Sequence, residues 1–548
     1  MTTINAIKLP AFYSVPVLPA NVSSGFLAAL LLLMGVLLLQ LLYQIIYYRF
    51  FHELRHVPGP FWASVTRLWT TWHFLRGTQL EAEWNAVKKY GPIVRLTPKM
   101  LLLADATAIP TVYHRRDTKS RFYIPSLVKT PFSIVLRHPG EHSAHRRLVS
   151  APYAMTNILR MEPLSTKHIE EFITKLDTCF ATPHRKLNFT DWGVYLFSDT
   201  ISDLAYRSSQ GMVAAGRDVG KIMKHVTVGT YAFVVLGSIY PLVEWITSSP
   251  LRRFIVLRPE QTNGWGRGMR KADDVLQERR DGLARGVITK AERGDGAYDF
   301  LQAFLDARTP EGAPIHPDKI QSEIFTILGA GPEAFQAILS ALFTEVLSNP
   351  LIRSKLNAEI NAALQSGKLT RPVPAYNEVA MHLPYFVACL REAMRLHPPP
   401  ALPLPREHTA QDPEVVLNGR VIPPGTELAC NPWISHRDRE VYGDDAEAYV
   451  PERWLGDEER ARLFERYNLM WGYGARVCLG KHYATMMLYK VPVALFMAFD
   501  VALCDVTPAT PRASFRPHGP ALLWENVWLI LRGRRAWDAE GEGEGEVA

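Results

Sequence analysis

The sequence has few cysteines for its length, and their spacing excludes several classes of protein. Five cysteines stand far apart among 548 residues, and no two of them form a CxxC pair. Their odd number and wide separation argue against a disulfide scaffold and favour a reducing compartment. Without CxxC pairs, zinc fingers and thioredoxin-like sites are excluded. Composition alone does not identify which cysteine, if any, has a chemical role.

The sequence also lacks a strong charge of one sign, internal repeats and long low-complexity linkers. Lys and Arg number 61 against 54 Asp and Glu, a net charge of +7 that is small for this length. No basic stripe with interleaved aromatic residues occurs, so we expect no nucleic-acid partner. The contents of 47% hydrophobic and 21% charged residues exclude a wholly disordered chain.

Long hydrophobic runs are absent apart from one near the N-terminus. Residues 25–48 carry no charge, and a helix of this length covers roughly the 30 Å hydrocarbon core of a bilayer. A cleaved signal peptide has a shorter apolar region, and a buried core helix would carry a polar face. We therefore predict a transmembrane anchor at 25–48. Basic residues concentrate after it, which predicts a cytosolic C-terminal side and a lumenal segment 1–24.

The rest of the chain is expected to form one body. Pro58-Gly59-Pro60 stops a helix, so it separates the anchor from this body. From there to Arg532 helical periodicity dominates and short β-like runs interrupt it. This pattern predicts a mainly α fold with small β-sheets over residues 58–532. Alternating Glu and Gly residues predict an acidic flexible tail at 533–548.

Periodicity and stop signals place several elements of this body. Residues 318–348 are predicted to form one long apolar helix that ends at Asn349-Pro350. Shorter helices are expected at 351–364, 385–396 and 482–500. Turn signals at Asn418-Gly419 and Pro423-Pro424-Gly425 predict short strands between residues 401 and 430.

One cysteine lies in an unusual setting within residues 471–480. Cys478 stands between Gly474 and Gly480 and directly before a predicted helix, whose backbone amides would stabilise a thiolate. The two glycines let the chain approach a flat partner closely. Arg476 is placed to meet an anion. Together these residues indicate a thiolate that ligates a metal cofactor with acidic substituents.

The same stretch resembles the cysteine-loop pattern of cytochromes P450, Phe-x-x-Gly-x-Arg-x-Cys-x-Gly, with Trp471 in place of the Phe. The resemblance implies the P450 fold, haem b as cofactor, and Cys478 as the axial ligand of the haem iron. It further implies a single-pass enzyme of the endoplasmic reticulum membrane with a cytosolic catalytic domain. Its electrons would come from NADPH through an NADPH–cytochrome P450 reductase.

Two further motifs stand in the order that the family shows. Glu392 and Arg395 form a Glu-x-x-Arg pair on a predicted helix, where residues three apart share a face. The segment Pro451–Trp454 is similar to the family's Pro-Glu-Arg-Phe element. The resemblance implies that Glu392, Arg395 and Arg453 form a structural ion-pair lock beneath the haem.

Three more basic residues match positions that bind haem propionates in the family. His142 and Arg146 stand where P450s have Trp-x-x-x-Arg, with histidine replacing the tryptophan, and Arg406 matches another such position. A guanidinium suits a carboxylate because it donates two parallel hydrogen bonds. The alternative for each residue is an ordinary solvated basic side chain.

The long predicted helix departs from the family where catalysis is expected. The P450 pattern is Ala/Gly-Gly-x-Asp/Glu-Thr-Thr, whose acid and alcohol supply protons for oxygen activation. Gly331 and Glu333 match it and are the expected catalytic positions, but Ala334 and Phe335 replace the two alcohols. Pro332 removes a backbone donor, which predicts a kink that offers a polar partner to water.

Two explanations of this departure compete. Glu333 with ordered water, or with a substrate hydroxyl, could replace the alcohol; we favour this because the acid is retained. Otherwise the protein could be a haem-thiolate isomerase, a dehydratase or a peroxide-using enzyme. The residues around Gly331 also fit Gly-x-Gly-x-x-Ala, but residues 351–364 look helical where a dinucleotide fold needs a strand, so that fold is rejected.

The expected substrate is a lipophilic small molecule. Apolar stretches at 122–136, 212–240 and 400–404 correspond to regions that line P450 pockets, and residues 233–236 are expected to dip into the bilayer. The resemblance implies a monooxygenase that hydroxylates, epoxidises or similarly oxidises its substrate with dioxygen, in the secondary metabolism of a fungus. A basic face for the reductase is expected at Lys481, Arg466 and Arg462. A non-catalytic, membrane-anchored haem-binding protein is the remaining alternative.

Overall fold

The computed structural model describes residues 20–114, 116–258, 260–261, 264–286 and 299–534. Backbone contacts divide the chain into two compact units, Met1–His56 and Val57–Ala548. Residues 1–19 of the predicted lumenal segment and residues 535–548 of the predicted tail lie outside the described residues.

The first unit contains the predicted anchor. Helix α1 (Ala20–Ile46) continues into a π-helical turn, η1 (Tyr47–Phe51). The apolar part, Gly25–Phe51, is 27 residues long, and 0% of its most apolar window is buried in the protein. This helix is long enough to span a bilayer, as predicted. The stretch Pro317–Ser348 is also long and apolar enough to span a membrane, but 67% of its most apolar part is buried inside the protein. It is therefore a core segment of the second unit.

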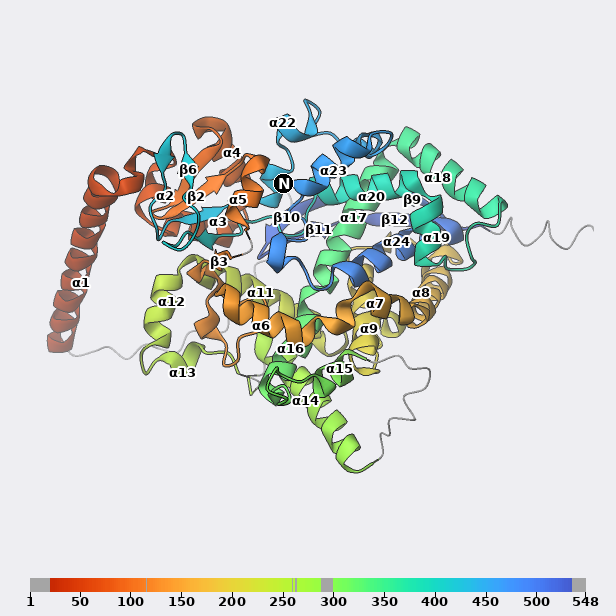
Figure 1. Cartoon of the computed structure of the whole chain (residues 1–548), viewed down its shortest axis with the longest axis horizontal. Helices are drawn as coiled ribbons and strands as arrows, with labels where there is room; N and C mark the ends of the chain where they lie inside the picture. Colours follow the sequence, from red (N-terminus) through yellow and green to blue (C-terminus); the bar gives the residue numbers. More distant parts are fainter. Residues whose placement is uncertain (1–19, 115, 259, 262–263, 287–298, 535–548) are drawn as a thin grey trace, which may run out of the picture. The chain divides into compact units, whose positions relative to one another are not determined.

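The second unit is built mainly from helices (Figure 1). Its first half contains the helices α2 (Phe61–Val65), α3 (Leu68–Arg76), α4 (Gln79–Tyr90), α5 (Ile109–Val112), α6 (Pro139–Val149), α7 (Met155–Arg160), α8 (Glu162–Leu176), α9 (Trp192–Tyr206), α10 (Met212–Ala215), α11 (Ile222–Ser238), α12 (Tyr240–Thr247), α13 (Arg252–Ile255), α14 (Gly264–Ala284) and α15 (Phe300–Asp306). Its second half contains α16 (Pro317–Ala330), α17 (Pro332–Ser348), α18 (Pro350–Gln365), α19 (Tyr376–His382), α20 (Pro384–Leu396), α21 (Pro432–Ser435), α22 (Arg439–Tyr442), α23 (Glu458–Arg466) and α24 (Lys481–Ala498).

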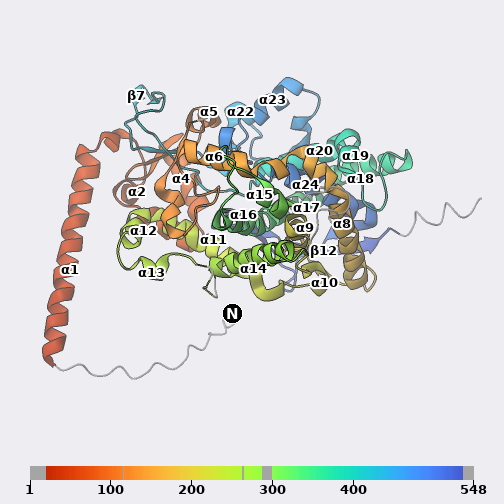
Figure 2. The ribbon, with the colours of Figure 1, turned by 60° about the horizontal axis from the view of Figure 1, so that its bottom comes forward.

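The long predicted core helix is divided into α16 and α17. The break lies at Gly331, and Pro332 begins α17. Because proline has no N–H, residue 332 cannot bond the Leu328 carbonyl, which explains why one continuous helix does not form. In Figure 2 both helices lie at the centre of the body, with α6 on one side and α14 on the other. Helix α17 packs against α9, α20 and α24, so the core surrounds this segment.

Other predicted elements are found with small shifts. Helices α18 and α20 correspond to the expected 351–364 and 385–396 helices. Helix α24 ends at Ala498 because the strand β9 (Phe499–Leu503) begins at the next residue. Asn418 and Gly419 have φ angles of 50° and 72°, which form the predicted tight turn between β6 (Val416–Leu417) and β7 (Arg420–Val421).

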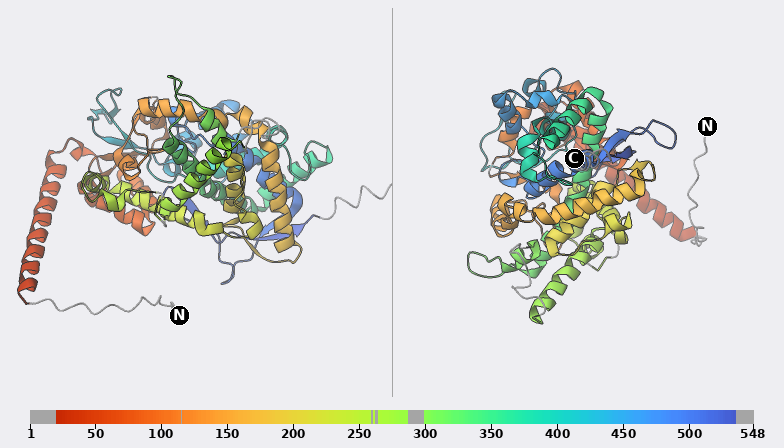
Figure 3. Two further views of the ribbon diagram at one scale, coloured as in Figure 1. Left: turned by 90° about the horizontal axis from the view of Figure 1, so that it is seen from below. Right: turned by 90° about the vertical axis from the view of Figure 1, so that its right-hand side faces the viewer.

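The remaining strands form small sheets beside the helices. The largest has the order β1-β2-β8-β5-β3, in which only β2 and β8 run parallel. Its strands are β1 (Ile93–Thr97), β2 (Met100–Leu103), β3 (Thr118–Lys119), β5 (Arg406–Glu407) and β8 (Glu427–Ala429). A second sheet has the order β4-β12-β9, from β4 (Leu187–Asn188) and β12 (Trp528–Gly533), and a hairpin joins β10 (Ser514–His518) to β11 (Ala521–Glu525). In both views of Figure 3 the C-terminal strands, drawn in blue, lie at the edge of the helical body.

Candidate active site

A cavity of about 380 Å³ lies inside the body, and Cys478 is part of its wall. Helices α16 and α17 contribute Thr326, Ile327, Ala330, Gly331, Ala334, Phe335 and Ile338. The cysteine loop contributes Trp471, Gly472 and residues 476–480, and other parts of the chain contribute Lys119, His142, Arg146 and Leu404. Residues far apart in the sequence thus meet around one largely apolar space.

Backbone geometry holds Cys478 at the wall. The Cys478 amide donates to the Trp471 carbonyl at 2.7 Å, which closes the loop. Gly472 and Gly474 have φ angles of 74° and 58°, a conformation that other residues rarely adopt. A Cβ at Gly474 would also lie 3.1 Å from the Tyr113 carbonyl oxygen. The predicted glycine is therefore required by both conformation and space.

The Cys478 thiol faces the cavity although it lies deep in the body. Burial raises its pKa, while the amides of Gly480 and Lys481 and the charge of Arg146 act to lower it. Helix α24 begins at Lys481, so the positive end of the helix dipole also lies beside the sulfur. These donors are suited to a thiolate that binds a metal ion, which removes the proton on ligation.

Arg146 and His142 are both on the cavity wall, on α6. Arg146 Nη1 donates to the Val477 carbonyl at 2.6 Å, so it also fixes the residue before Cys478. Burial, followed by the charges of Arg476 and Lys119, lowers the pKa of His142 to about 3. His142 is therefore neutral at physiological pH.

Arg406 and Arg476 meet at a buried carboxylate that the sequence motifs do not reveal. Asp117 Oδ2 accepts from Arg406 Nε at 2.6 Å, and Asp117 Oδ1 accepts from Arg476 Nε at 2.6 Å. Arg476 lines the cavity, whereas Arg406 lies behind the wall. Asp117 is 289 residues before Arg406 and 359 before Arg476, so only the folded chain brings the three together.

The cavity fits a flat, apolar group with acidic substituents, such as haem. Two cationic side chains, Arg146 and Arg476, line an otherwise largely apolar space together with a single carboxylate, that of Glu323. Lys119 also lines it, but burial and the charges of Arg406 and Arg476 lower its pKa well below the usual value. Arg476 directs four of its five N–H groups to protein acceptors, and no described residue accepts from the remaining Nη1 proton. This excess of positive charge and the remaining donor suit the two propionates of haem.

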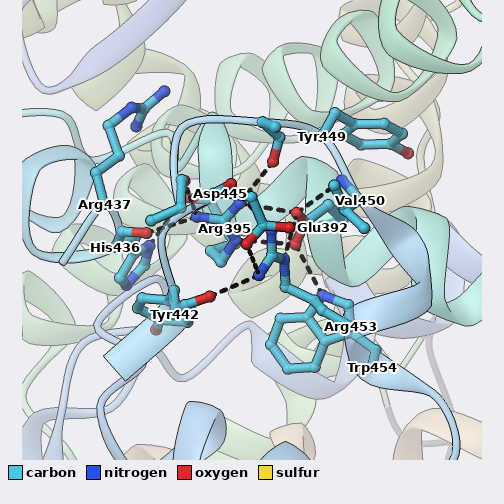
Figure 4. Close-up of polar contacts among 12 residues, drawn as sticks. Glu392, Arg395, His436, Arg437, Tyr442, Asp445, Tyr449, Val450, Arg453 and Trp454 are labelled. Carbon is cyan, nitrogen blue, oxygen red and sulfur yellow. Dashed lines mark hydrogen bonds and ion pairs between the residues drawn. The ribbon is translucent and has the colours of Figure 1, made fainter. Parts of the chain in front are cut away.

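The predicted ion-pair lock is present and fully buried (Figure 4). Arg395 donates from Nε and Nη2 to the two oxygens of Glu392, both at 2.8 Å, and Arg453 Nε donates to the same carboxylate at 2.8 Å. The Val450 amide and the Trp454 indole add bonds of 3.0 and 2.9 Å. Burial alone would raise the pKa of Glu392, but the hydrogen bonds and charges of the two arginines outweigh it and lower the pKa.

The lock also fixes the segment that precedes the cysteine loop. Arg395 donates its remaining N–H groups to the carbonyls of His436, Ala446 and Ala448, at 2.6, 2.6 and 3.0 Å. The His436 ring contacts the Arg395 carbonyl through Nδ1 at 3.1 Å, and its Nε2 accepts from the Leu469 amide at 2.9 Å. This chain of bonds connects α20 to the start of the cysteine loop.

The predicted acid at Glu333 points away from the cavity. Gly331 and Ala334 line the wall, but Glu333 does not, and its carboxyl group is hydrogen-bonded to Thr227 on α11. A Cβ at Gly331 would clash with the Phe197 ring, so glycine is required at the break. Thr227 is 106 residues from Glu333, and no sequence motif indicated it.

A second acid, which the motifs also miss, lines the cavity from α16. Glu323 Oε1 accepts from His145 Nε2 at 2.8 Å and from the amide and hydroxyl of Ser133, both at 3.1 Å. These bonds join α16 to α6 and to the loop before it. Amphipathic periodicity could have placed Glu323 on a helix but not against these partners.

The expected pocket walls are found only in part. Ser133, Ile134, Pro400 and Leu404 come from the predicted stretches, but none of residues 212–240, all of which are described, lines this cavity. The expectation that residues 233–236 enter the bilayer was wrong for Phe233 and Val234, which are only 8% and 3% exposed because they pack into the core.

Comparison with known proteins agrees with the site. The family model described as Cytochrome P450 matches residues 56–521. Quiannulatic acid synthase of Emericella variicolor is 47% identical over 515 residues, covering 94% of this chain and 97% of that protein. Cytochrome P450 monooxygenase gsfF of Penicillium aethiopicum is 30% identical over 470 residues, covering 84% of this chain and 90% of that protein. Cytochrome P450 monooxygenase cicH of Emericella nidulans is 30% identical over 507 residues, covering 90% and 94%. The chain therefore belongs to the cytochrome P450 family and is a haem-dependent monooxygenase.

Proposed function

We propose that this enzyme is a haem-thiolate monooxygenase in which Cys478 is the axial ligand of the haem iron and the substrate is a lipophilic small molecule of fungal secondary metabolism. The observation that carries the proposal is the Cys478 thiol on the wall of an apolar cavity, at the N-terminus of α24. The fungal sources and names of the relatives support the metabolic setting.

The protein's own residues bind and orient the cofactor. Arg146 and Arg476 would hold the propionates of the haem, and neutral His142 would offer a further donor. Arg406 does not line the cavity and would support Arg476 through their shared partner Asp117. Trp471, Gly474 and Gly480 shape the loop so that the sulfur reaches the cavity. Glu392, Arg395 and Arg453 hold the segment before the loop and have a structural role.

The thiolate-ligated haem supplies the redox centre that reduces dioxygen and oxidises a C–H bond or double bond. One oxygen atom enters the substrate and the other leaves as water, with consumption of two electrons and two protons. Ile327, Phe335 and Ile338 exclude bulk water from this space. Gly331 allows the Phe197 ring to pack against the helix break, and Glu333 lies two residues further along the helix.

The electrons are proposed to come from NADPH through an NADPH–cytochrome P450 reductase. Lys481 begins α24 beside the cysteine, and Arg466 and Arg462 are exposed on α23. The Arg462 charge is balanced by Glu458 at 2.8 Å, so Lys481 and Arg466 contribute more to a basic docking face. The membrane is proposed to be that of the endoplasmic reticulum, with α1 spanning it once and the catalytic body in the cytosol.

The product class follows from one relative. Quiannulatic acid synthase is named for an acid. By analogy, we propose that the present enzyme oxidises its substrate to a carboxylic acid. Successive oxidations of one methyl carbon, through the alcohol and the aldehyde, each consume one dioxygen, two electrons and two protons. Exposed aromatic residues of the body, Trp72, Trp245 and Phe254, are proposed to contact the bilayer from which such a substrate is drawn.

Labelled dioxygen tests the proposal against its alternatives. Full-length enzyme is supplied with NADPH, reductase and a fungal extract of lipophilic precursors, and products are analysed by mass spectrometry. Incorporation of label that depends on NADPH supports a monooxygenase. Turnover without label or NADPH would instead indicate an isomerase, a dehydratase or a peroxide-using enzyme, and no turnover with any precursor would indicate a non-catalytic haem protein.

A further inference from the structure

The acid that the central helix retains is contacted by an alcohol from another helix. At the position after Glu333 the chain has Ala334, which carries no hydroxyl. Thr227, on α11, instead places its hydroxyl oxygen in hydrogen-bonding contact with Glu333 Oε1. An acid and an alcohol therefore still form a pair beside the break at Gly331, although they come from different helices.

The bonds of Thr227 indicate where the proton lies. Its hydroxyl oxygen contacts both Glu333 Oε1 and the Met223 carbonyl oxygen, the latter at 2.9 Å. A hydroxyl has one proton, and neither an ionised carboxylate nor a carbonyl has one to give. Both contacts are satisfied together when Glu333 is protonated and donates to Thr227, while Thr227 donates to Met223.

The surroundings of Glu333 favour the same protonated state. No described residue forms an ion pair with Glu333. On α11, Lys224 is exposed, and the His225 ring contacts the Lys221 carbonyl of its own helix at 2.6 Å. Burial raises the pKa of the Glu333 carboxyl, and the bond to Thr227 opposes this only in part.

We propose that Thr227 is a positioning residue that, from α11, holds Glu333 protonated beside the helix break. The proposal rests on the monooxygenase function proposed above. Glu333 releases its proton across the break, where Ala330, Gly331 and Ala334 form the cavity wall, and is reloaded from solvent. The carbonyl of Leu328, which Pro332 cannot bond, offers a water molecule an acceptor on this route.

Three variants of the full-length holoenzyme separate this role from packing. Thr227→Val keeps the shape and removes the hydroxyl, whereas Thr227→Ser keeps the hydroxyl. Thr230→Val is the control on the same helix: Thr230 bonds the Val226 carbonyl at 2.9 Å and accepts from Trp265 Nε1 at 3.2 Å without contacting Glu333. A normal reduced carbon monoxide spectrum establishes that each variant is folded with haem, and Thr227→Ala replaces any Thr227→Val preparation that fails this criterion.

The first readout is the product formed per electron consumed. We expect Thr227→Val to lower the product formed per electron roughly tenfold, with the lost electrons recovered as peroxide. For Glu333→Gln we expect a larger loss, of ~10²-fold. Thr227→Ser and Thr230→Val are expected to match the wild type. Equal values for Thr227→Val and wild type would overturn the proposal.

The second readout needs no turnover. A protonated carboxyl gives an infrared carbonyl band, which Glu333→Gln should remove, Thr227→Val should shift, and Thr227→Ser should retain. A band unaffected by Glu333→Gln would show that Glu333 is ionised and would overturn the proposal even if the enzyme is a monooxygenase. Conversely, absence of labelled product from the wild type would disprove the monooxygenase function, whatever the infrared result.

Discussion

Two buried glutamates of this protein have opposite surroundings. Glu392, in the ion-pair lock, receives hydrogen bonds from Arg395, Arg453, Val450 and Trp454, and the pKa of its carboxyl is lowered. Glu333, beside the break in the central helix, meets one hydroxyl and no described cation, and the pKa of its carboxyl is raised. The difference shows that the donors around a buried acid decide in which direction its pKa shifts.

The largest effect is expected from breaking the lock. Glu392→Gln leaves buried Arg395 without its counter-charge and Arg453 with only Asp445, at 3.0 Å. Loss of one partner of a buried pair costs about 3–5 kcal/mol. We expect the variant to unfold at lower urea and to purify with little haem. Urea unfolding in detergent and the haem-to-protein ratio measure both effects.

An exposed pair provides the matched control for that variant. Glu458 and Arg462 form a 2.8 Å ion pair on α23, with side chains 88% and 77% exposed. Surface pairs contribute little, so Glu458→Gln should leave the unfolding curve and haem content unchanged. Equal effects of the two substitutions would contradict the structural role assigned to Glu392.

The helix break should be the next most sensitive feature. Gly331→Ala forces a methyl group against the Phe197 ring, and overpacking of this kind costs about 1–3 kcal/mol. We expect a lower melting temperature, which the second substitution Phe197→Leu should partly restore by making room. A Gly331→Ala variant with unchanged melting temperature would show that α16 and α17 can separate to accept the methyl group.

The lock should also make stability depend on pH through His436. Burial lowers the pKa of His436 to about 3, below its ordinary value of 6.5, so the unfolded chain binds the proton first as the pH falls. The contribution of neutral His436 to the free energy of unfolding is therefore complete above pH 6.5 and is lost toward pH 3. Between these values the free energy of unfolding falls by up to ~1.4 kcal/mol per pH unit. Urea unfolding at several pH values measures the slope. His436→Asn should reduce this slope by the amount that corresponds to about one proton bound on unfolding. An unchanged slope would contradict the neutral state of His436 in the folded protein.

The smallest effect is expected at Trp454. Its indole N–H donates to Glu392 Oε2 at 2.9 Å, a bond that the family's phenylalanine cannot make. Because the other donors of the lock remain, Trp454→Phe should cost only about 1 kcal/mol and leave haem content normal. Differential scanning calorimetry of the two proteins measures this. Haem loss like that of Glu392→Gln would mean that the lock depends on the indole.

The sequence predicted those parts of the site whose partners follow a fixed local pattern. Residues 471–480 close on themselves, and Glu392 and Arg395 share one turn of a helix, so their short motifs could be recognised by their resemblance to the family patterns. Partners that fold in from distant elements were not predictable. Asp117 bridges Arg406 and Arg476, and Thr227 reaches Glu333, through contacts set by packing and not by any local period.

The fold was predicted more completely, because apolar periodicity and proline stop signals act locally. The single helix expected over 318–348 was the main error. Pro332 was recognised as a kink, but the close approach of Phe197, which excludes any side chain at 331, comes from α9 and has no signal in the helix itself. Residues 233–236 of α11 were assigned to the membrane for a similar reason, since an apolar stretch indicates burial but not what covers it.

The central claim is that Cys478 ligates the haem iron, and one spectrum tests it most directly. The full-length protein is reduced and exposed to carbon monoxide, and the Soret band is recorded for wild type and for Cys478→Ser. We expect the strongly red-shifted band of a thiolate-ligated haem in the wild type and its loss in the variant, while Cys430→Ser, a buried cysteine away from the cavity wall, retains it. A wild type without that band, or a Cys478→Ser variant that keeps it, would contradict the account.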